Sequence, residues 1–429
     1  MKICLVTAFP PGGRQLNEYG LHLARELQKN PLISLTVMGD RLEEVDFATD
    51  ANGTPISLAE ELPEFDVLRC WKFNSVSNPH RIMKALRQIR PDVVWFNLVF
   101  STFGTQQFPV AAFAGLCIPA MVRAAGYNTH VTLHHIMEHV DMSAANIKAE
   151  RMFRMASSVA TRMLLLSNSI TVLLPAYRRT LVERYRAQNV HFRSHGILGA
   201  RPERPDFSRR GKPDHRVLAI GHWGTYKRLE TLFEAFPRVL EEIPNAKLVV
   251  AGANHHTMPG YWESFAEKYR GNDRYEFRGY VPEDDIPGLY ASSSVVVLPY
   301  NSSTGSSGPA HQACQYGLPI ISSDIPEFRD MAIDEHMAVD FFPIGDAFEL
   351  GKQLVSLLSS AEKQQAMAEH NFFAALRMTM PQLIREYLRS FDLQERTRLM
   401  DGGSGLRRAA SWSANRSRTY PYGRWAPWT

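Results

Sequence analysis

Short runs of apolar residues alternate along the chain with longer segments in which apolar residues recur every three or four positions. The short runs are typical of strands buried in a parallel sheet, and the longer period is typical of amphipathic helices. In the first half this pattern predicts strands at 2–7, 32–38, 66–68, 91–97, 130–135 and 170–174. It predicts helices at 17–28, 80–90, 105–125, 144–168 and 176–188. This alternation predicts a doubly wound α/β domain.

The same alternation begins again after a polar, proline-rich stretch at 198–215, which we interpret as a linker. Strands are predicted at 216–220, 246–251, 275–277, 295–299 and 320–321, and helices at 229–243, 261–269, 284–291, 309–316, 347–359 and 361–393. The pattern therefore predicts one domain at 1–197, a second at 216–360, helices at 361–395 that cross back to the first domain, and a basic, disordered tail at 396–429.

Composition excludes several classes of protein. The chain has 429 residues and a net charge of +4, but 402–429 carry five arginines and no acid, so the remainder has 4 − 5 = −1. A nearly neutral body argues against nucleic acid as a partner. The four cysteines are scattered without a C-x-x-C pair, which favours a reducing, cytoplasmic compartment over a disulfide framework or a zinc site. No run of about 18 uncharged apolar residues predicts a membrane-spanning helix.

A loop of serine and glycine at 302–308 lies between a predicted strand and a predicted helix. Glycine lets the backbone approach a ligand, and the free N–H groups of a first helical turn point at an anion. Gly305, Ser306, Ser307 and Gly308 are therefore candidates to hold a diphosphate, although a serine-rich surface loop is the alternative. Gly12 and Gly13, after the first strand, are candidates for the same role, and the alternative there is a tight turn without a ligand.

Several segments of the second half occur in an order found in one known family. They are 220–236, with a lysine and a helix ending in Glu-Ala; 246–252; 277–281, Phe-x-Gly-x-Val; 289–300; 313–321; and 325–327, Ile-Pro-Glu. Together they resemble the donor domain of the retaining group 1 (family four) glycosyltransferases. The first half fits the acceptor domain of that family more loosely, at 9–13 and 131–135. The resemblance covers about 1–395 and implies the GT-B fold, in which two doubly wound, Rossmann-like domains face a central cleft.

The resemblance also implies roles for individual residues. Lys227 matches the phosphate clamp, where its charge would stabilise the leaving diphosphate. His134 and His135 match a histidine that contacts the donor sugar. Because side chains alternate along a strand, we expect one of the pair, His134, to enter the cleft. The remaining implied contacts to the donor are His222, Arg228, Gly279, Val281 and Glu327.

The sequence departs from the family pattern at two places. The clamp begins with His222 where the family usually has arginine. The family also usually has two glutamates eight positions apart around the phosphate loop, and here Thr304 and Gln312 stand at those positions. Gln312 could still bond a ribose hydroxyl through its amide, and Thr304 could contact a sugar hydroxyl without adding charge.

The lead hypothesis is transfer of a sugar from a nucleoside-diphosphate sugar to a glycan, a lipid-linked sugar or a small molecule, with retention of configuration. Because a double displacement would need a carboxylate nucleophile, front-face attack is the simpler route. A GT-B protein with weakened or no catalysis, which binds nucleotide sugar or a partner, is the alternative. A sugar-nucleotide epimerase would need acids and bases in the cleft, and the candidates for them are His134, His135, Glu138 and Glu327.

No metal and no cofactor besides the donor is expected. His134 or His135 with Glu138 and Asp141 would make a loosely spaced metal site, and the family is metal-independent in catalysis. Peripheral membrane contact stays open, because the tail joins five arginines to three tryptophans and because 108–122 and 152–166 are apolar. A disordered tail and two buried helices are the alternatives.

Overall fold

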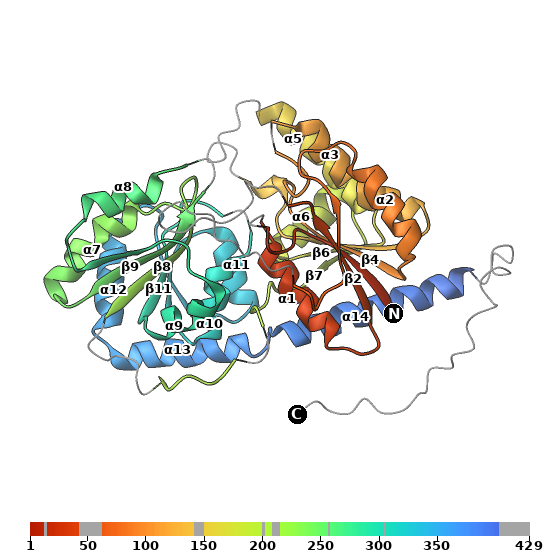
Figure 1. Cartoon of the computed structure of the whole chain (residues 1–429). Coiled ribbons are helices and arrows are strands. Elements are labelled where there is room, and N and C mark those ends of the chain that lie inside the picture. Colours follow the sequence, from red (N-terminus) through yellow and green to blue (C-terminus); the bar gives the residue numbers. More distant parts are fainter. Residues whose placement is uncertain are drawn as a thin grey trace. The chain divides into compact units, whose positions relative to one another are not determined.

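The computed structural model describes residues 1–12, 15–42, 62–105, 107–140, 150–199, 202–207, 215–255, 258–303 and 305–402. Within these ranges the chain forms two parallel sheets, each accompanied by helices (Figure 1). The predicted fold class, two Rossmann-like α/β domains, is confirmed.

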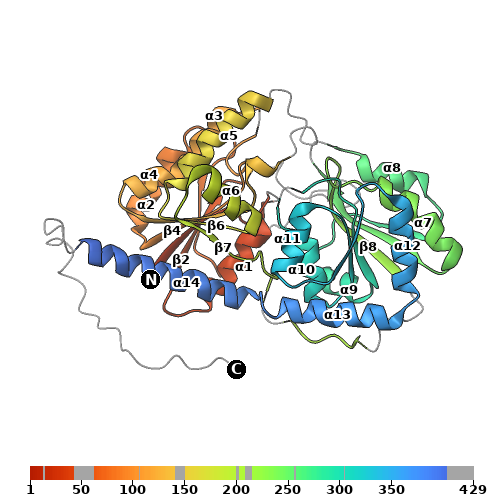
Figure 2. The same cartoon turned by 180° about the vertical axis from the view of Figure 1, so that it is seen from behind.

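The first sheet has seven strands in the order β3-β2-β1-β4-β5-β6-β7, and its strand pairs are parallel. Its strands are β1 Lys2–Val6, β2 Ser34–Asp40, β3 Val67–Trp71, β4 Val93–Leu98, β5 Asn128–Leu133, β6 Ser169–Val172 and β7 Val190–Phe192. Its helices are α1 Asn17–Gln28, α2 Asn78–Ile89, α3 Pro109–Leu116, α4 Ile118–Ala124, the 3-10 turn η2 Met137–His139, α5 Glu150–Leu165 and α6 Pro175–Tyr185. Helices α2 to α5 gather on one face of the sheet and α1 on the other (Figures 1 and 2).

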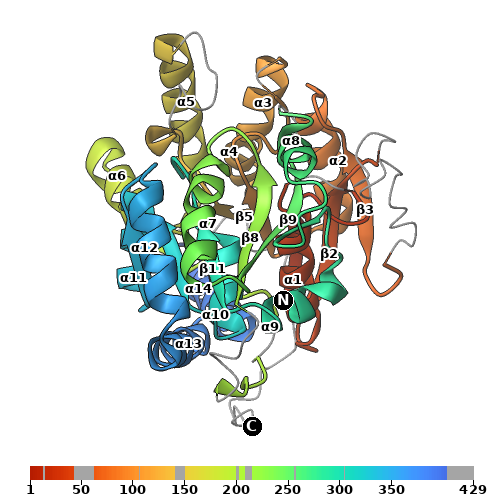
Figure 3. The same cartoon turned by 90° about the vertical axis from the view of Figure 1, so that its left-hand side faces the viewer.

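The second sheet has six strands in the order β10-β9-β8-β11-β12-β13, and it is also parallel. Its strands are β8 Arg216–Trp223, β9 Lys247–Asn254, β10 Tyr275–Arg278, β11 Val295–Leu298, β12 Ile320–Ser323 and β13 Val339–Phe342. Its helices are α7 Glu230–Glu242, α8 Tyr261–Lys268, η4 Glu283–Asp285, α9 Ile286–Ala291, α10 Gly308–Gln315, α11 Pro326–Asp334, α12 Ala347–Leu358 and α13 Ala361–Ala375. Helices α7 and α12 pack side by side (Figure 3).

The hydrophobic pattern located most of these elements, and helix α1 has the predicted bounds with its predicted inward residues, Leu21, Leu23, Ala24 and Leu27, buried. The structure differs from the prediction in several places. The predicted helix at 105–125 is two helices, α3 and α4, that meet at Cys117. Strand β8 runs three residues further than predicted, to Trp223. The short strands β7 and β13 and the helix α11 have no predicted counterpart. The predicted helix at 361–393 is divided between α13 and α14 (Met380–Gly402).

The segment that follows β7 and the segment that leads into α14 are joined by backbone hydrogen bonds. The N–H of Ile197 donates to the carbonyl of Met378 at 3.0 Å, and the N–H of Met380 donates to the carbonyl of Gly199 at 3.2 Å. Residues 386–429 form a separate compact unit, in which α14 is described as far as Gly402. The remainder of the predicted basic tail lies outside the described residues.

The centre of each sheet is fully covered. Every residue of β4, β5, β11 and β12 is buried, as expected for parallel strands with helices on their faces. Buried indole groups are hydrogen-bonded: Trp95 Nε1 donates to Thr132 Oγ1 at 2.9 Å, and Trp223 Nε1 donates to the carbonyl of Ala251 at 2.8 Å. Among the described helices, none has the length and apolar character needed to span a bilayer.

Candidate functional site

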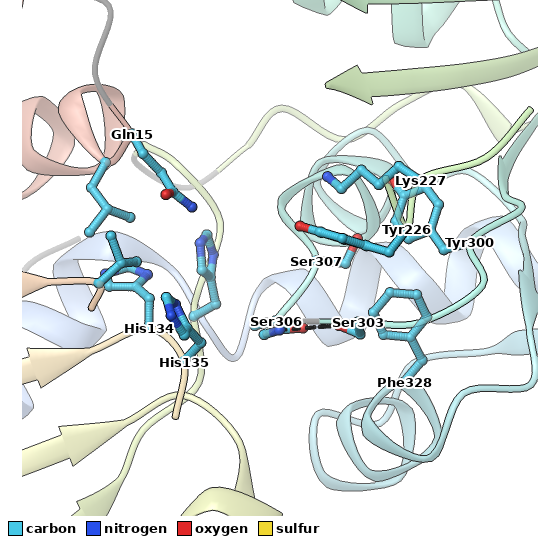
Figure 4. Close-up of a pocket in the computed structure, with 14 residues that line it drawn as sticks. Gln15, His134, His135, Tyr226, Lys227, Tyr300, Ser303, Ser306, Ser307 and Phe328 are labelled. Carbon is cyan, nitrogen blue, oxygen red and sulfur yellow. Dashed lines mark hydrogen bonds between the residues drawn. The ribbon is translucent and has the colours of Figure 1, made fainter. Parts of the chain in front are cut away.

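A pocket of about 160 Å³ lies where the carboxyl ends of strands from both sheets meet (Figure 4). Its lining residues come from segments that follow parallel strands, which is where open α/β sheets bind ligands. Segments after strands of the first sheet contribute Gln15, Leu16, Val99, His134, His135 and His195. Segments after strands of the second sheet contribute Tyr226, Lys227, Tyr300, Ser303, Gly305, Ser306, Ser307 and Phe328. The pocket therefore has two walls, one from each sheet.

Lys227 is held in the pocket by a tight turn after β8. The backbone N–H and C=O groups of Gly224 and Lys227 bond each other at 2.9 and 3.0 Å, and the Nζ atom of Lys227 lies 5.0 Å from the centre of the Tyr300 ring. Burial acts to lower the pKa of Lys227, but the phenol groups of Tyr300 and Tyr226 outweigh it, so that the pKa is raised. The side chain is a cation at neutral pH.

The predicted phosphate loop forms the neighbouring part of the same wall. The hydroxyl of Ser303 donates to the carbonyl of Gly305 at 2.7 Å and accepts from its N–H at 3.2 Å, which shapes the turn. Ser307 caps α10, because its hydroxyl accepts from the N–H of Ala310 at 3.4 Å. Gly305 comes close to the opposite wall, since a Cβ atom there would lie 2.7 Å from the carbonyl oxygen of His134.

The opposite wall is rich in neutral histidine. His134 Nε2 lies 2.7 Å from Asn97 Oδ1, and because the Asn97 amide nitrogen donates to Thr7, its oxygen is the acceptor and Nε2 carries the proton. Burial, together with the nearby His195 and His135, holds the pKa of His134 well below its usual range. Burial lowers the pKa of His135 to about 4, and burial and the nearby His311 lower that of His195 to about 3. Neutral imidazole can donate and accept at once, which suits contacts to hydroxyl groups.

The expectation that only one of His134 and His135 enters the cleft is wrong. Strand β5 ends at Leu133, so both histidines lie beyond it and the alternation of a strand no longer applies. Both line the pocket, and the His135 ring packs 5.8 Å from that of Phe100.

Five predicted donor contacts of the second domain are engaged elsewhere or lie outside the pocket lining. Because β8 continues to Trp223, His222 is a strand residue, and it is exposed. Arg228 forms an ion pair with Glu230, with Nη2 and Oε1 2.5 Å apart. The carbonyl of Gly279 accepts from the N–H of Gly252 at 2.9 Å, and Val281 packs against the core. Gly308 opens α10, and a Cβ atom there would meet nothing.

Three further predicted contacts also lie outside the pocket lining, and two fall outside the described residues. Gln312 accepts from the hydroxyl of Tyr290 at 2.9 Å, and Glu327 lies 3.0 Å from His139 Nδ1. The carbonyl of Gly12 accepts from the amide of Asn17 at 2.6 Å. Gly13 and Thr304 are outside the described residues. The roles assigned to all of these residues stay predictions.

Sequence reasoning did not select several residues that line the pocket: Gln15, Leu16, Val99, His195, Tyr226, Tyr300, Ser303 and Phe328. Tyr300 could have been predicted, because it follows a predicted strand at the edge where ligands bind. Nothing in the sequence pointed to His195, because it lies between the linker and β7, a strand that was not predicted.

The loosely spaced metal site is not assembled among the described residues. The Glu138 carboxylate accepts from the Tyr185 hydroxyl, and Asp141 lies outside the described residues. In the part of the chain that the structure describes, no three histidine, cysteine or acidic side chains are grouped so that they could hold a metal ion.

Comparison with known proteins finds a family model that matches part of the chain. Residues 214–360 match the family model described as "Glycosyl transferases group 1". An uncharacterized glycosyltransferase of Methanocaldococcus jannaschii is 36% identical over 83 residues, which are 19% of this chain and 20% of that protein. The matched part thus spans about a fifth of that relative.

Two solved structures resemble this chain over about nine-tenths of its length. Sucrose-phosphate synthase of Thermosynechococcus elongatus superimposes with a TM-score of 0.67 at 14% identity, over 92% of this chain and 99% of that one. HepE of Anabaena in complex with UDP-glucose superimposes with a TM-score of 0.63 at 14% identity, over 91% and 100%. At such low identity the likeness establishes the fold. The chain therefore has the GT-B fold, and its residues 214–360 match the model of the group 1 glycosyl transferases.

Proposed function

We propose that the protein transfers a sugar from a nucleoside-diphosphate sugar to an acceptor hydroxyl. The observation that carries the proposal is the wall formed by Lys227 and the loop from Ser303 to Ser307, which places a cation beside the N-terminus of α10. Such a wall is complementary to a diphosphate, and the neutral histidines opposite are suited to sugar hydroxyls. A nucleoside diphosphate with its sugar between the walls accounts for both. HepE, a structural neighbour, was solved with UDP-glucose, which is consistent with this donor class.

In this reaction the bond between the anomeric carbon and the diphosphate oxygen breaks, and negative charge grows on the leaving oxygens. Lys227 and the helix N-terminus lie ready to stabilise that charge without rearrangement. The acceptor oxygen forms the new bond to the anomeric carbon, and its proton passes to an oxygen of the leaving diphosphate. We assign His134 a catalytic role: Asn97 fixes its tautomer, so that Nδ1 is free of a proton and can accept from a hydroxyl of the reacting sugar.

We infer retention of configuration through front-face attack. A double displacement needs a carboxylate beside the anomeric carbon, and the described lining residues contain no aspartate or glutamate. The stereochemistry of the product, read from the anomeric coupling constant by NMR, tests this inference. An inverted product would exclude it.

We also propose that transfer requires no metal ion and no cofactor besides the donor, since Lys227 and the backbone amides supply the positive potential. Treatment with EDTA should leave turnover unchanged. Loss of activity that Mg²⁺ or Mn²⁺ restores would contradict the proposal.

The central test is Lys227→Ala, assayed for donor hydrolysis and transfer with a panel of UDP-, GDP- and ADP-sugars. We expect turnover with the preferred donor to fall by about 10²- to 10³-fold, as for removal of a main charge-stabilising group. Lys352→Ala is the matched control, because Lys352 lies exposed on α12, paired with Glu349. An unchanged rate for Lys227→Ala would exclude the proposed site.

A second candidate function is binding of a nucleotide sugar with weakened or no catalysis. The position of Gln312 favours it, because this neutral amide is bonded to Tyr290 and stands where the family has a carboxylate. The same donor panel separates the two: a thermal shift with a nucleotide sugar, but no hydrolysis and no transfer, would support binding alone.

For the acceptor we propose a lipid-linked molecule at a membrane surface, on which the protein docks through α3 and α5. Helix α5 exposes two large apolar side chains, since Met152 and Met155 are 67% and 68% exposed. Its neighbour α3 exposes Val110 and, just before it, Phe108. The two helices lie together at one end of the first domain (Figures 1 and 2). Helix α5 has three arginines and one glutamate, so an anionic lipid surface is the complementary partner.

A further inference from the structure

Behind the phosphate loop, His311 of α10 is buried against Glu335, the residue that follows α11. The two side chains are 1% and 4% exposed, and His311 Nε2 lies 2.7 Å from Glu335 Oε2. Neither residue lines the pocket, and neither matches any motif of the sequence. Burial of two charged groups costs desolvation free energy, so this pair invites a functional explanation.

The contacts of His311 define its protonation state. Its Nδ1 lies 2.7 Å from the carbonyl oxygen of Ser307, which can only accept, so Nδ1 carries a proton. Nε2 is close enough to the Glu335 carboxylate for a strong charge–charge attraction, which only the doubly protonated ring can make. The arrangement therefore favours an imidazolium paired with a carboxylate. Consistent with this, Glu335 and the Ser307 carbonyl outweigh the effect of burial and raise the pKa of His311.

The groups around the pair leave this charge in place. The His195 ring, from the opposite wall, lies 4.8 Å from that of His311, and its lowered pKa makes it neutral. Near Glu335, burial raises the pKa of the Cys314 thiol, so Cys314 is also neutral. The Asp334 carboxylate is the other nearby acid, and it faces Glu335.

The carbonyl of Ser307 thus accepts from two donors of one residue. The backbone N–H of His311 reaches it at 3.2 Å and the side chain at 2.7 Å. Ser307 is also the cap of α10, so these two hydrogen bonds fix the position at which the loop enters the helix. The positive end of the pair lies on the side of the loop, and the negative end lies on the side of α11.

We propose that His311 is a positioning residue of the diphosphate site, an imidazolium that fixes the end of the phosphate loop and adds positive potential behind its amides. Glu335 keeps it protonated. This inference rests on the proposed function, because it assumes that the loop binds the donor diphosphate. It predicts that affinity for a diphosphate depends on a residue that does not touch the ligand.

The test measures binding of inorganic diphosphate by calorimetry between pH 5.5 and 8, so that the unknown base and sugar play no part. In Glu335→Gln, only the Ser307 carbonyl still opposes the effect of burial, so the pKa of His311 falls. Affinity should therefore approach that of the wild type at pH 5.5 and weaken by roughly tenfold by pH 8. Because removing one partner of a buried pair can prevent folding, the double variant His311→Asn/Glu335→Gln is included. It should bind about tenfold more weakly at every pH. His370→Asn, an exposed histidine of α13, is the control.

Three outcomes separate this inference from the proposed function. If the wild type binds no diphosphate, or Lys227→Ala does not weaken it, the proposed function fails. If Lys227→Ala weakens binding but the double variant binds as the wild type does, the role of His311 alone is overturned. A separate readout needs no ligand: the ¹⁵N spectrum of labelled histidine should show His311 doubly protonated at pH 7.5. A neutral ring there would also overturn the inference.

Discussion

Gly305 shows how closely the two walls of the pocket approach each other at a single residue. A Cβ atom there would lie 2.7 Å from the carbonyl oxygen of His134, a distance that real Cβ atoms do not adopt. Since the obstacle is backbone, it cannot move aside as a flexible side chain would. The phosphate loop and the histidine wall must separate to make room.

We therefore expect Gly305→Ala to lower turnover by about 10- to 100-fold through misplacement of the loop. The thermal midpoint should fall little, because the clash lies between the two walls of the pocket and not within either hydrophobic core. Gly288→Ala is the control, because a Cβ atom at Gly288 of α9 meets open space. Steady-state kinetics of the two variants provide the measurement. Equal turnover for both would show that the contact does not matter.

Residues of the candidate site could be predicted only where a chemically suitable side chain stands near the end of a predicted strand. Lys227 and the loop at Gly305 follow predicted strands, His134 lies at the end of one, and all line the pocket. Glu327 and Gln312 follow strands too, but each is bonded to another side chain outside the pocket lining. Periodicity tells which segment reaches the cleft, whereas the partner of a polar side chain depends on residues distant in sequence.

At the scale of elements, the missed strands share a physical cause. β7 and β13 are edge strands of three and four residues, and each includes a charged or polar residue, as in Val-His-Phe and Val-Asp-Phe-Phe. An edge strand is paired on one side only, so it needs no continuous apolar run. The central strands β4 and β11 are buried on both faces, and their apolar runs made them predictable.

The sequence predicted helix α5, but it did not predict which face of the helix is buried. Its buried face is built mainly from the small residues Ser157, Ala160 and Thr161 with Leu164, while Met152 and Met155 stay exposed, so hydrophobicity alone did not predict which residues pack inward. Replacement of Met152, Met155 and Val159 by serine should leave the thermal midpoint nearly unchanged, because these side chains are exposed. Association with vesicles of phosphatidylcholine and phosphatidylglycerol should weaken at least tenfold, because three apolar side chains no longer enter the lipid.

Co-sedimentation with vesicles measures the effect, and vesicles of phosphatidylcholine alone show the contribution of charge. Ile333→Ser/Ile344→Ser is the matched control, since both isoleucines are exposed in the second domain. If the triple variant sediments with lipid as the wild type does, α5 is not the docking surface.

For the whole molecule, the buried neutral histidines set the pH dependence of stability. Unfolded histidine binds a proton below about pH 6.5, whereas folded His135 and His195 bind one only near pH 4 and 3, and His130 is also held well below its usual range. The unfolded state therefore takes up more protons, and the free energy of unfolding falls as the pH drops below 6.5. Each such histidine contributes a slope of about 1.4 kcal/mol per pH unit.

Urea unfolding at pH 5, 6 and 7 should show this loss of stability in acid. His130→Asn removes a buried histidine of β5 that is bonded to Ser169. It should reduce the number of protons taken up on unfolding, which sets the slope, by about one. His311 acts in the opposite sense: its raised pKa adds stability that is complete below pH 6.5 and is lost as the pH rises through its folded pKa. Stability that stays constant between pH 7 and 5 would contradict the assignment of neutral, buried imidazoles.

The paired backbone at Ile197 and Thr379 has a mechanical consequence. The chain passes between the two sheets twice, outward after Gly199 and back before Met380, and the two passages are fastened side by side as a short parallel bridge. A single tether lets two bodies turn about any axis, but two tethers clamped together resist twisting and leave bending across the clamp as the easy motion. Gly196 and Gly199, with φ of 79° and 119°, adopt backbone angles at this clamp that other residues avoid. Opening of the pocket to admit a donor would thus be a hinge-bending motion of the two domains about this clamp.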